Sequence, residues 1–345
     1  MSQAPSATAR AQPNIALVKY WGKRDAALNL PAVGSLSVTL GNLYTETTVT
    51  LDESLDADVL ELDGLDLDGG ESSAEQTRVR EFLTRLRERC GVASVPRARV
   101  RSHNNFPTAA GLASSASGFA ALTVAAAGAY GVTLSATDAS VLARIGSGSA
   151  PRSLYGGFVE MRHGERDDGE DAIAVQVAER EHWPLHVLVA QTAHGRKKIG
   201  STAGMQRTAD SSPFYPAWVE GAEADLASAR DAIARRDFEA LAAVTEQSCL
   251  KMHAVAAAAR PGVIYWNGTT VEVMHALRAL REAEGVALTF TIDAGPHVKV
   301  FTPSAESAAA ARVALERVEG VVGVLDAGMG PGAQLVDVAG GAGSS

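Results

Sequence analysis

A loop rich in small residues leads into a helix near residue 114 and is the first stretch that could do chemistry. It contains Pro107 and Gly111, three serines follow within one helical turn, and an alanine-rich segment then runs to about Tyr130. The first N–H groups of a helix have no intrahelical partner and carry partial positive charge, so they attract anions, most often phosphate. The pattern fits neither a Walker A loop nor a Gly-x-Gly-x-x-Gly fingerprint. A phosphate site and an ordinary alanine-rich core helix are both open at this point.

Two further segments combine basic groups with hydroxyls. Lys19 and Lys23 flank Tyr20 where a buried strand ends in a polar turn. Lysines in such a place are often only solvated, and that alternative stays open. Residues 146–153 form a second small-residue loop, in which two serines precede Arg152. Hydroxyls beside a planar guanidinium suit a carboxylate or a phosphate.

A basic run and one aspartate complete the candidate groups. The run at 196–198 borders another small-residue loop at 200–205, and Asp293 lies in a tight turn after a strand. An aspartate in a turn is more often a local backbone acceptor than a catalyst. His253 and His297 are isolated and are interpreted as structural. The whole set predicts an enzyme that acts on a polyphosphate and on a second phosphorylated or carboxylated small molecule.

Composition limits the partners and the location. The 345 residues are 46% hydrophobic and carry a formal net charge of −9, which argues against a nucleic-acid or membrane-surface binder. No apolar run approaches the roughly 20 residues of a membrane span. Cys90 and Cys249 lie far apart without metal-type spacing, and a reducing cytoplasm is the simplest location for them. We therefore expect a cytoplasmic enzyme for small molecules, with no nucleic-acid and no membrane partner.

The order of elements predicts an α+β protein with two domains. Helices and strands mix without a strict βαβ rhythm. A domain boundary near the buried strand at 184–190 gives an N-terminal domain of residues 1–187, a C-terminal domain of residues 188–330 and a Gly-rich tail of residues 331–345. Local composition also predicts a frayed start at residues 1–11, a solvated hairpin or loop at residues 52–70, and one helix at residues 218–235.

Five segments together resemble one known family. The segment 107–116 is similar to the phosphate loop of the GHMP small-molecule kinases, and four others narrow the resemblance to the mevalonate diphosphate decarboxylase family within them. The match runs in order along most of the chain. Two departures are Val33-Gly34, where many members have Asn-Ser, and Ala203, where some bacterial members have Arg. The four narrowing segments are Asn14–Asp25, Asn104–Pro107, Ser147–Ser153 and Ile292–His297.

The resemblance implies a fold and a reaction. The fold would be the two-domain GHMP kinase fold, with a ribosomal protein S5 domain 2-like N-terminal domain and a ferredoxin-like C-terminal domain. With ATP and Mg2+ the enzyme would phosphorylate the tertiary 3-hydroxyl of mevalonate 5-diphosphate, and loss of that phosphate with CO2 would give isopentenyl diphosphate. The alternatives are an enzyme for mevalonate 5-phosphate, a GHMP kinase without decarboxylation, and a non-enzymatic ligand-binding protein. A homodimer is expected by analogy with relatives.

The resemblance also implies roles for individual residues. Asp293 would orient or deprotonate the 3-hydroxyl, with Lys19 beside it. Ser115 would lie nearest the transferred phosphoryl group and Mg2+, and Arg152 would hold the substrate carboxylate. The other substrate-binding residues would be Tyr20, Trp21, Gly22, Lys23, Arg78, Ser147, Gly148, Ser149, Ala150 and Thr202. ATP would lie along Asn105, Pro107, Ala110, Gly111, Leu112, Ala113, Ser114 and Ser115, with Lys197.

Overall fold

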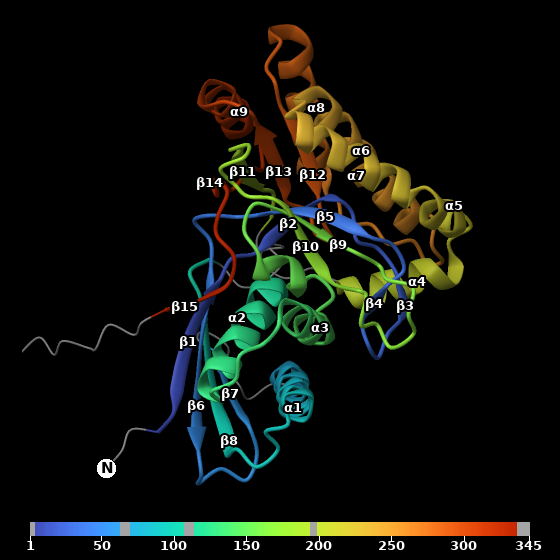
Figure 1. Ribbon diagram of the computed structural model, residues 1–345. Coiled ribbons are helices and arrows are strands. Elements are labelled where there is room, and N and C mark those ends of the chain that lie inside the picture. The colour runs from blue at the N-terminus through green and yellow to red at the C-terminus, as the bar shows by residue number, and fades with distance from the viewer. Residues whose placement is uncertain (1–3, 63–69, 107–113, 194–198, 337–345) are drawn as a thin grey trace, which may run out of the picture.

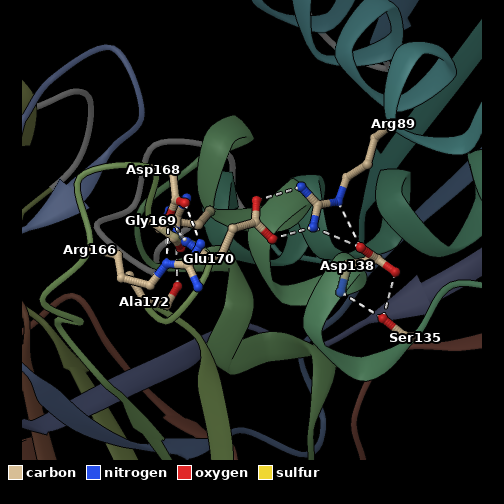
Figure 2. Close-up of polar contacts among 9 residues, drawn as sticks. Arg89, Ser135, Asp138, Arg166, Asp168, Gly169, Glu170 and Ala172 are labelled. Atoms are coloured by element: carbon tan, nitrogen blue, oxygen red, sulfur yellow. Dashed lines mark hydrogen bonds and ion pairs between the residues drawn. The ribbon is translucent and has the colours of Figure 1, made fainter.

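The chain forms an α+β protein in which sheets and helices alternate in layers (Figure 1). The computed structural model describes residues 4–62, 70–106, 114–193 and 199–336. In Figure 1 the first half of the chain forms the lower part of the molecule and most of the second half forms the upper part. The predicted nucleotide-binding residues that lie outside the described residues are Pro107, Ala110, Gly111, Leu112, Ala113 and Lys197.

The lower sheet in Figure 1 combines strands from both ends of the described chain. Its strands are β1 (Ser6–Ala11), β6 (Thr45–Asp52), β7 (Val59–Leu62), β8 (Arg97–Asn104) and β15 (Gln334–Val336). Three helices accompany it: α1 (Gly70–Cys90), α2 (Ser114–Ala129) and α3 (Ala136–Gly146). The strand order is β15-β1-β6-β8-β7, and only the β7–β8 pair is parallel. Side chains of β6 alternate between buried and half-buried, so one face of the sheet packs on the core under these helices.

Two expectations for the first half are wrong. The start of the chain is ordered from Ser6, because β1 pairs with β6 on one side and with β15 on the other. The Asp-rich stretch is not wholly solvated, because β7 pairs with β8 and Asp58 just before it is only 3% exposed. Both strands find their partners far along the chain, where local composition carries no information about them.

Asp58 forms a buried ion pair that joins α1 to the lower sheet. Its carboxylate accepts hydrogen bonds from both terminal guanidinium nitrogens of Arg87, one of them at 2.9 Å. It also accepts a hydrogen bond from the backbone N–H of Ala98 at 2.8 Å. Asp58→Ala would leave the Arg87 charge buried without compensation. We expect the free energy of unfolding in urea to fall by about 3–5 kcal/mol.

A surface ion pair on the same sheet provides the control for this variant. Asp52 is half-buried and lies 3.4 Å from Arg99. Asp52→Ala should leave the free energy of unfolding close to that of the wild type, because exposed ion pairs contribute little. An equally small change for Asp58→Ala would contradict the assigned role of the buried pair.

A second sheet lies between the two halves (Figure 1). Its strands are β2 (Asn14–Val18), β5 (Ser35–Thr39), β9 (Phe158–Met161) and β10 (Ala174–Ala178), in the order β10-β9-β5-β2. Every residue of β2, β5 and β9 is buried. The cause is packing against a 3-10 helix, η1 (Ala150–Leu154), and against two helices of the second half, α6 (Ala222–Arg235) and α7 (Phe238–Ala257). A small hairpin of β3 (Lys23–Asp25) and β4 (Leu30–Pro31) follows β2.

The upper sheet is antiparallel and belongs to the second half. Its strands are β11 (His186–Gln191), β12 (Thr289–Ile292), β13 (Val298–Thr302) and β14 (Gly323–Asp326), in the order β12-β13-β11-β14. The remaining helices are α4 (Ser201–Ser211), α5 (Tyr215–Glu220), α8 (Gly268–Glu284) and α9 (Ala305–Arg317). Helices α8 and α9 pack on this sheet, while α7 contacts both β12 and β2. In the described part of the chain, no helix is long and apolar enough to cross a membrane.

Two expectations for the second half are also wrong. The helix expected at 218–235 is two helices, α5 and α6, separated at Gly221. The expected loop at 200–205 is the first turn of α4. Its small residues serve close packing, since a Cβ on Gly204 would lie 2.4 Å from the Tyr265 hydroxyl oxygen.

One hydrophobic core crosses the junction of the two halves. It includes Ile15 of β2, Val187 of β11, Leu226 of α6 and Phe301 of β13. Two hydrogen bonds reinforce this junction. The Thr291 hydroxyl donates to the carbonyl oxygen of residue 16 at 3.3 Å, and the N–H of residue 19 donates to the Ser248 hydroxyl at 3.0 Å. The end of β2 is therefore held against α7 and β12.

Candidate active site

A pocket with a cavity volume of about 220 Å³ opens at this junction. The first half lines it with residues after β2, in the β3–β4 hairpin, on α1, at the start of α2 and in the loop between α3 and η1. The second half adds the start of α4 and the turn after β12. Of the predicted site residues, the lining contains Lys19, Tyr20, Trp21, Lys23, Arg78, Ser115, Ser147, Gly148, Ser149, Arg152, Thr202 and Asp293.

Asp293 is held by two lysines. The Lys19 Nζ lies 2.5 Å from its Oδ1, and the Lys299 Nζ lies 3.2 Å from its Oδ2. Burial by itself raises the pKa of Asp293, but the two ammonium groups outweigh this effect and hold the pKa far below its usual range. Lys19 is not solvated, because its side chain is only 1% exposed, whereas the Asp293 side chain keeps 25% exposure. The pair therefore presents an ionised carboxylate beside a fixed ammonium.

Arg152 is buried and is held by neutral groups. Its Nε donates to Asn14 Oδ1 at 3.2 Å, and its Nη1 donates to the Ser35 hydroxyl at 2.6 Å. The guanidinium lies 6.0 Å from the centroid of the Tyr20 ring. Burial lowers the pKa of Arg152 to about 10, so the side chain is still charged at neutral pH. Within the described part of the chain it makes no ion pair, and this suits an anionic ligand.

Lys23 and Arg78 add two positive charges to the lining of the pocket. The Lys23 Nζ donates to Asn29 Oδ1 at 2.5 Å, and the Asn29 amide donates to the carbonyl of Ile145 at 2.8 Å. Arg78 donates to the carbonyl of Gly146 at 2.9 Å. Burial and the nearby Arg78 lower the pKa of Lys23. Two cations close enough for Arg78 to lower the pKa of Lys23 are suited to a diphosphate.

A row of serine hydroxyls connects α2 with the loop before η1. Ser115 Oγ lies 3.4 Å from Ser147 Oγ, which lies 3.3 Å from Ser149 Oγ. Gly148 allows the Tyr20 phenol to approach this loop, since a Cβ there would lie 2.4 Å from the phenol oxygen. Each hydroxyl can donate a hydrogen bond to a phosphate oxygen and accept one from a neighbouring serine.

The first turn of α4 faces the same pocket. Ser201 and Thr202 belong to its lining. Gly200 occupies the N-cap position and offers no side-chain acceptor to the first N–H groups of the helix. These groups and the helix dipole add to the attraction for an anion.

The charges of the pocket oppose those of the chain. The described lining residues include four cations and one carboxylate: Lys19, Lys23, Arg78, Arg152 and Asp293. The chain as a whole has a net charge of −9. This concentration of positive charge favours a small ligand with several negative charges.

A second pocket of about 130 Å³ adjoins the first and is more apolar. Arg78 and Ser115 line both pockets, so the two cavities meet at these residues. Ser114 lines the second pocket, as does Asn104. Its apolar wall comes from β7, β8, α1 and α2 and consists of Leu60, Leu62, Val79, Val100, Phe119 and Leu122.

Three predicted site residues lie outside both pockets as the described residues define them. Gly22 has a φ of 106° and packs under Tyr215, whose hydroxyl would lie 2.1 Å from a Cβ there. Ala150 is fully buried in the core of the first half. The Asn105 amide is used by the backbone of residues 42–44, at 2.7 and 2.9 Å. These three residues support neighbouring segments. Of the adjacent asparagines 104 and 105, it is Asn104 that lines a pocket.

Comparisons with known proteins agree in both halves of the chain. Residues 11–174 match the model of the diphosphomevalonate decarboxylase-like N-terminal domain, and residues 187–320 match that of the mevalonate 5-diphosphate decarboxylase C-terminal domain. The diphosphomevalonate decarboxylase of Ganoderma lucidum is 42% identical over 314 residues, which cover 86% of this chain and 78% of that protein. The chain belongs to the diphosphomevalonate decarboxylase family.

Solved structures of diphosphomevalonate decarboxylases share the whole fold. The enzyme from Staphylococcus aureus is 38% identical, with a TM-score of 0.88 over 96% of this chain and 98% of that one. A complex of MDDEF with MVAPP, AMPPCP and magnesium is 40% identical, with a TM-score of 0.86 over 96% of this chain and 99% of that one. The predicted two-domain α+β fold is therefore confirmed.

Sequence reasoning missed several groups that line this diphosphomevalonate decarboxylase pocket or lie beside it. Asn14 positions Arg152, and Asn29 positions Lys23. A signal for Asn29 was its place in a short hairpin, where it adopts a φ of 52° that asparagine tolerates better than most residues. Lys299 had no local signal, because it reads as one polar residue within an apolar strand.

Proposed function

We propose that this protein catalyses the ATP-dependent decarboxylation of mevalonate 5-diphosphate to isopentenyl diphosphate. The observation that carries the proposal is the arrangement of three groups in one pocket: the carboxylate of Asp293, the ammonium of Lys19 and the guanidinium of Arg152. A plain kinase has no need of a buried guanidinium for a substrate carboxylate. Membership of the family and the MDDEF complex with MVAPP support the same reaction.

The substrate binds with its two ends at different cationic groups. Arg152 takes the carboxylate through the fork of donors that a guanidinium offers. Lys23 and Arg78 take the diphosphate, together with Tyr20. The hydroxyls and backbone that complete this cradle come from Ser147, Gly148, Ser149 and Thr202, with Trp21 packed beside them. This places the 3-hydroxyl, which lies between the two ends of the substrate, near Asp293.

The nucleoside of ATP occupies the second pocket. Its apolar wall suits a purine ring, and it joins the substrate pocket at Ser115 and Arg78. The phosphate chain then passes the start of α2, and the γ-phosphoryl group reaches the first pocket near Ser115. The binding of AMPPCP by MDDEF supports a nucleotide here.

The donor groups fit Mg2+ held mainly by phosphates. Among the described residues there is no group of three His, Cys or carboxylate side chains that could enclose a metal ion. Mg2+ often keeps several waters and binds substrate phosphates with few protein ligands. The Ser115 hydroxyl would contribute such a ligand, and the ion would neutralise charge on the β- and γ-phosphates. The presence of magnesium in the MDDEF complex supports this assignment.

The two chemical steps use different groups. A tertiary alcohol is a poor nucleophile, and Asp293 orients its O–H towards the phosphoryl group and accepts the proton as the new P–O bond forms. Lys19 stabilises the negative charge of the transferred phosphoryl group. In the second step the phosphate leaves as the C–C bond to the carboxylate breaks, and the surrounding cations and helix N–H groups stabilise that leaving group.

A parallel assay of two substrates tests the function. With ATP and Mg2+, mevalonate 5-diphosphate should release ADP and CO2 in equal amounts, and mevalonate 5-phosphate should react much more slowly. ADP without CO2 would identify a kinase without decarboxylation. Faster turnover of the 5-phosphate would reassign the substrate, because the positive charges of Lys23 and Arg78 would then have a single phosphate to bind.

We further propose that the enzyme is a cytoplasmic homodimer. Homodimers among relatives support the assembly by analogy, and two widely separated cysteines are compatible with a reducing compartment. Light scattering of the purified protein would reveal a monomer if the analogy fails. Fractionation of cells would test the location.

A further inference from the structure

Lys299 lies beneath the carboxylate of Asp293 and belongs to neither pocket. It occupies the centre of β13, directly opposite Thr291 of β12, and its side chain is fully buried. Its Nζ lies 3.2 Å from Asp293 Oδ2, while Oδ1 takes the Lys19 ammonium. Each oxygen of one carboxylate therefore faces a different lysine.

A lysine at this position is costly for folding. Every residue of β13 is buried, and the neighbours Val298 and Val300 have no exposed surface. Removing an ammonium from water carries a large desolvation cost, and a protein with a well-packed apolar side chain of similar volume in its place is often as stable or more so. Stability therefore gives no reason for a charge here, and its contact with Asp293 points to a role in the site.

We propose that Lys299 is a positioning residue that anchors Oδ2 of Asp293, so that Oδ1 and Lys19 are fixed towards the substrate hydroxyl. The proposal rests on the proposed function, in which Asp293 orients that hydroxyl. Without the anchor, the Asp293 carboxylate is free to rotate about its terminal bond and to pair with Lys19 through either oxygen. An orienting group that rotates loses the alignment that catalysis needs.

The histidines and the cysteine around Asp293 are neutral, so Lys19 and Lys299 supply the positive charge beside its carboxylate. His253 on α7 and His297 after β12 also face this region, and burial lowers their pKa values to about 3 and about 4, so both are neutral. Burial raises the pKa of the Cys249 thiol on α7. Burial lowers the pKa of Lys299, and the adjacent Asp293 carboxylate opposes this effect. Together the Lys19 and Lys299 ammonium groups hold the pKa of Asp293 far below its usual range, which keeps the carboxylate ionised.

The test compares Lys299→Met with Lys299→Gln and Lys299→Arg. We expect the Met and Gln variants to lower kcat by about 10- to 100-fold, as is typical when a group that orients a metal ligand is lost, with little change in the KM for ATP. Removing the ammonium raises the pKa of Asp293, so the acid side of the kcat profile should move to higher pH. Arg keeps the charge and should restore the wild-type acid side at least in part.

A double-mutant cycle separates positioning from structure. In an Asp293→Asn background, Lys299→Met should cause no further loss of kcat, because the group it positions is already gone. Lys251→Met is the matched control, since Lys251 of α7 pairs with the carboxylate of Asp225 on α6 and does not line the pocket. Its kcat and pH profile should equal those of the wild type.

Three results would overturn the proposal. They are an unchanged kcat and pH profile in the Met variant, an unchanged kcat and pH profile in Gln if Met does not fold, and an equal loss of kcat in the Asp293→Asn background. Thermal melting and binding of a fluorescent ATP analogue verify that each variant is folded. Failure of the proposed function would be seen separately, as absence of CO2 release by the wild-type enzyme.

Discussion

Replacing Asp293 with asparagine should lower kcat by about three orders of magnitude and leave the affinity for ATP nearly unchanged. The amide keeps the size of the side chain but removes the charge between Lys19 and Lys299. It can neither accept the proton of the 3-hydroxyl nor balance the two ammonium groups, whose Nζ atoms lie 2.5 and 3.2 Å from the carboxylate. In the proposed binding mode ATP lies in the neighbouring pocket, so its affinity should not change.

Single-turnover measurements of ADP and CO2 formation would check this expectation, with nucleotide binding measured separately. Asp225→Asn removes a carboxylate from another lysine pair, outside the pocket, and should behave as the wild type. An Asp293→Asn enzyme that keeps most of its kcat would show that the carboxylate neither orients nor accepts the proton. It would not affect the assignment of Arg152.

The pH dependence of Asp293 has a definite sign. Because its pKa in the folded protein lies far below the ordinary value, it stays ionised through the whole neutral and mildly acidic range. Its contribution to stability is therefore fully present above the pKa of the unfolded chain and is lost as the pH falls towards the folded value. An ordinary aspartate has a pKa of about 4, and the pKa of Asp293 lies below that value. Any loss of wild-type kcat above about pH 4 should therefore come from a group other than Asp293.

Replacing Arg152 with lysine should raise the barrier by about 1.5–3 kcal/mol, which is about 10- to 150-fold in kcat/KM. A lysine keeps the positive charge but loses the planar fork of donors. It also cannot bond to Asn14 and Ser35 and hold the substrate carboxylate in the same geometry. The loss should therefore affect alignment of the carboxylate for C–C cleavage as well as binding.

Steady-state kinetics with mevalonate 5-diphosphate would measure this loss, and the ratio of CO2 to ADP would locate it. Arg230→Lys is the control, since that arginine pairs with Glu160 and Glu223 outside the pocket. A lower ratio of CO2 to ADP would show that Arg152 matters most in the decarboxylation step. Wild-type kcat/KM would remove Arg152 from the binding of the carboxylate.

The sequence alone determined the chemical types in the site and the segments that carry them. A strand that ends in lysines, a glycine–serine loop before Arg152 and an aspartate in a turn each have a local pattern. The fold class followed in the same way from the order of helices and strands. Local errors arose where a segment's structure depends on distant partners, as at β1, at β7 and in the first turn of α4.

The tertiary structure alone decided which of these groups act together and in what state. Lys19 and Asp293 are separated by 274 positions along the chain, and only the packing of β2 against α7 and β12 brings them into contact. Burial then sets the charge states, because it removes the water that would otherwise screen two lysines from one carboxylate. Lys299 is the clearest case of a residue whose role the sequence does not reveal. Its residue type is plain in the sequence, but its significance depends on a sheet register that places its ammonium under the second oxygen of Asp293.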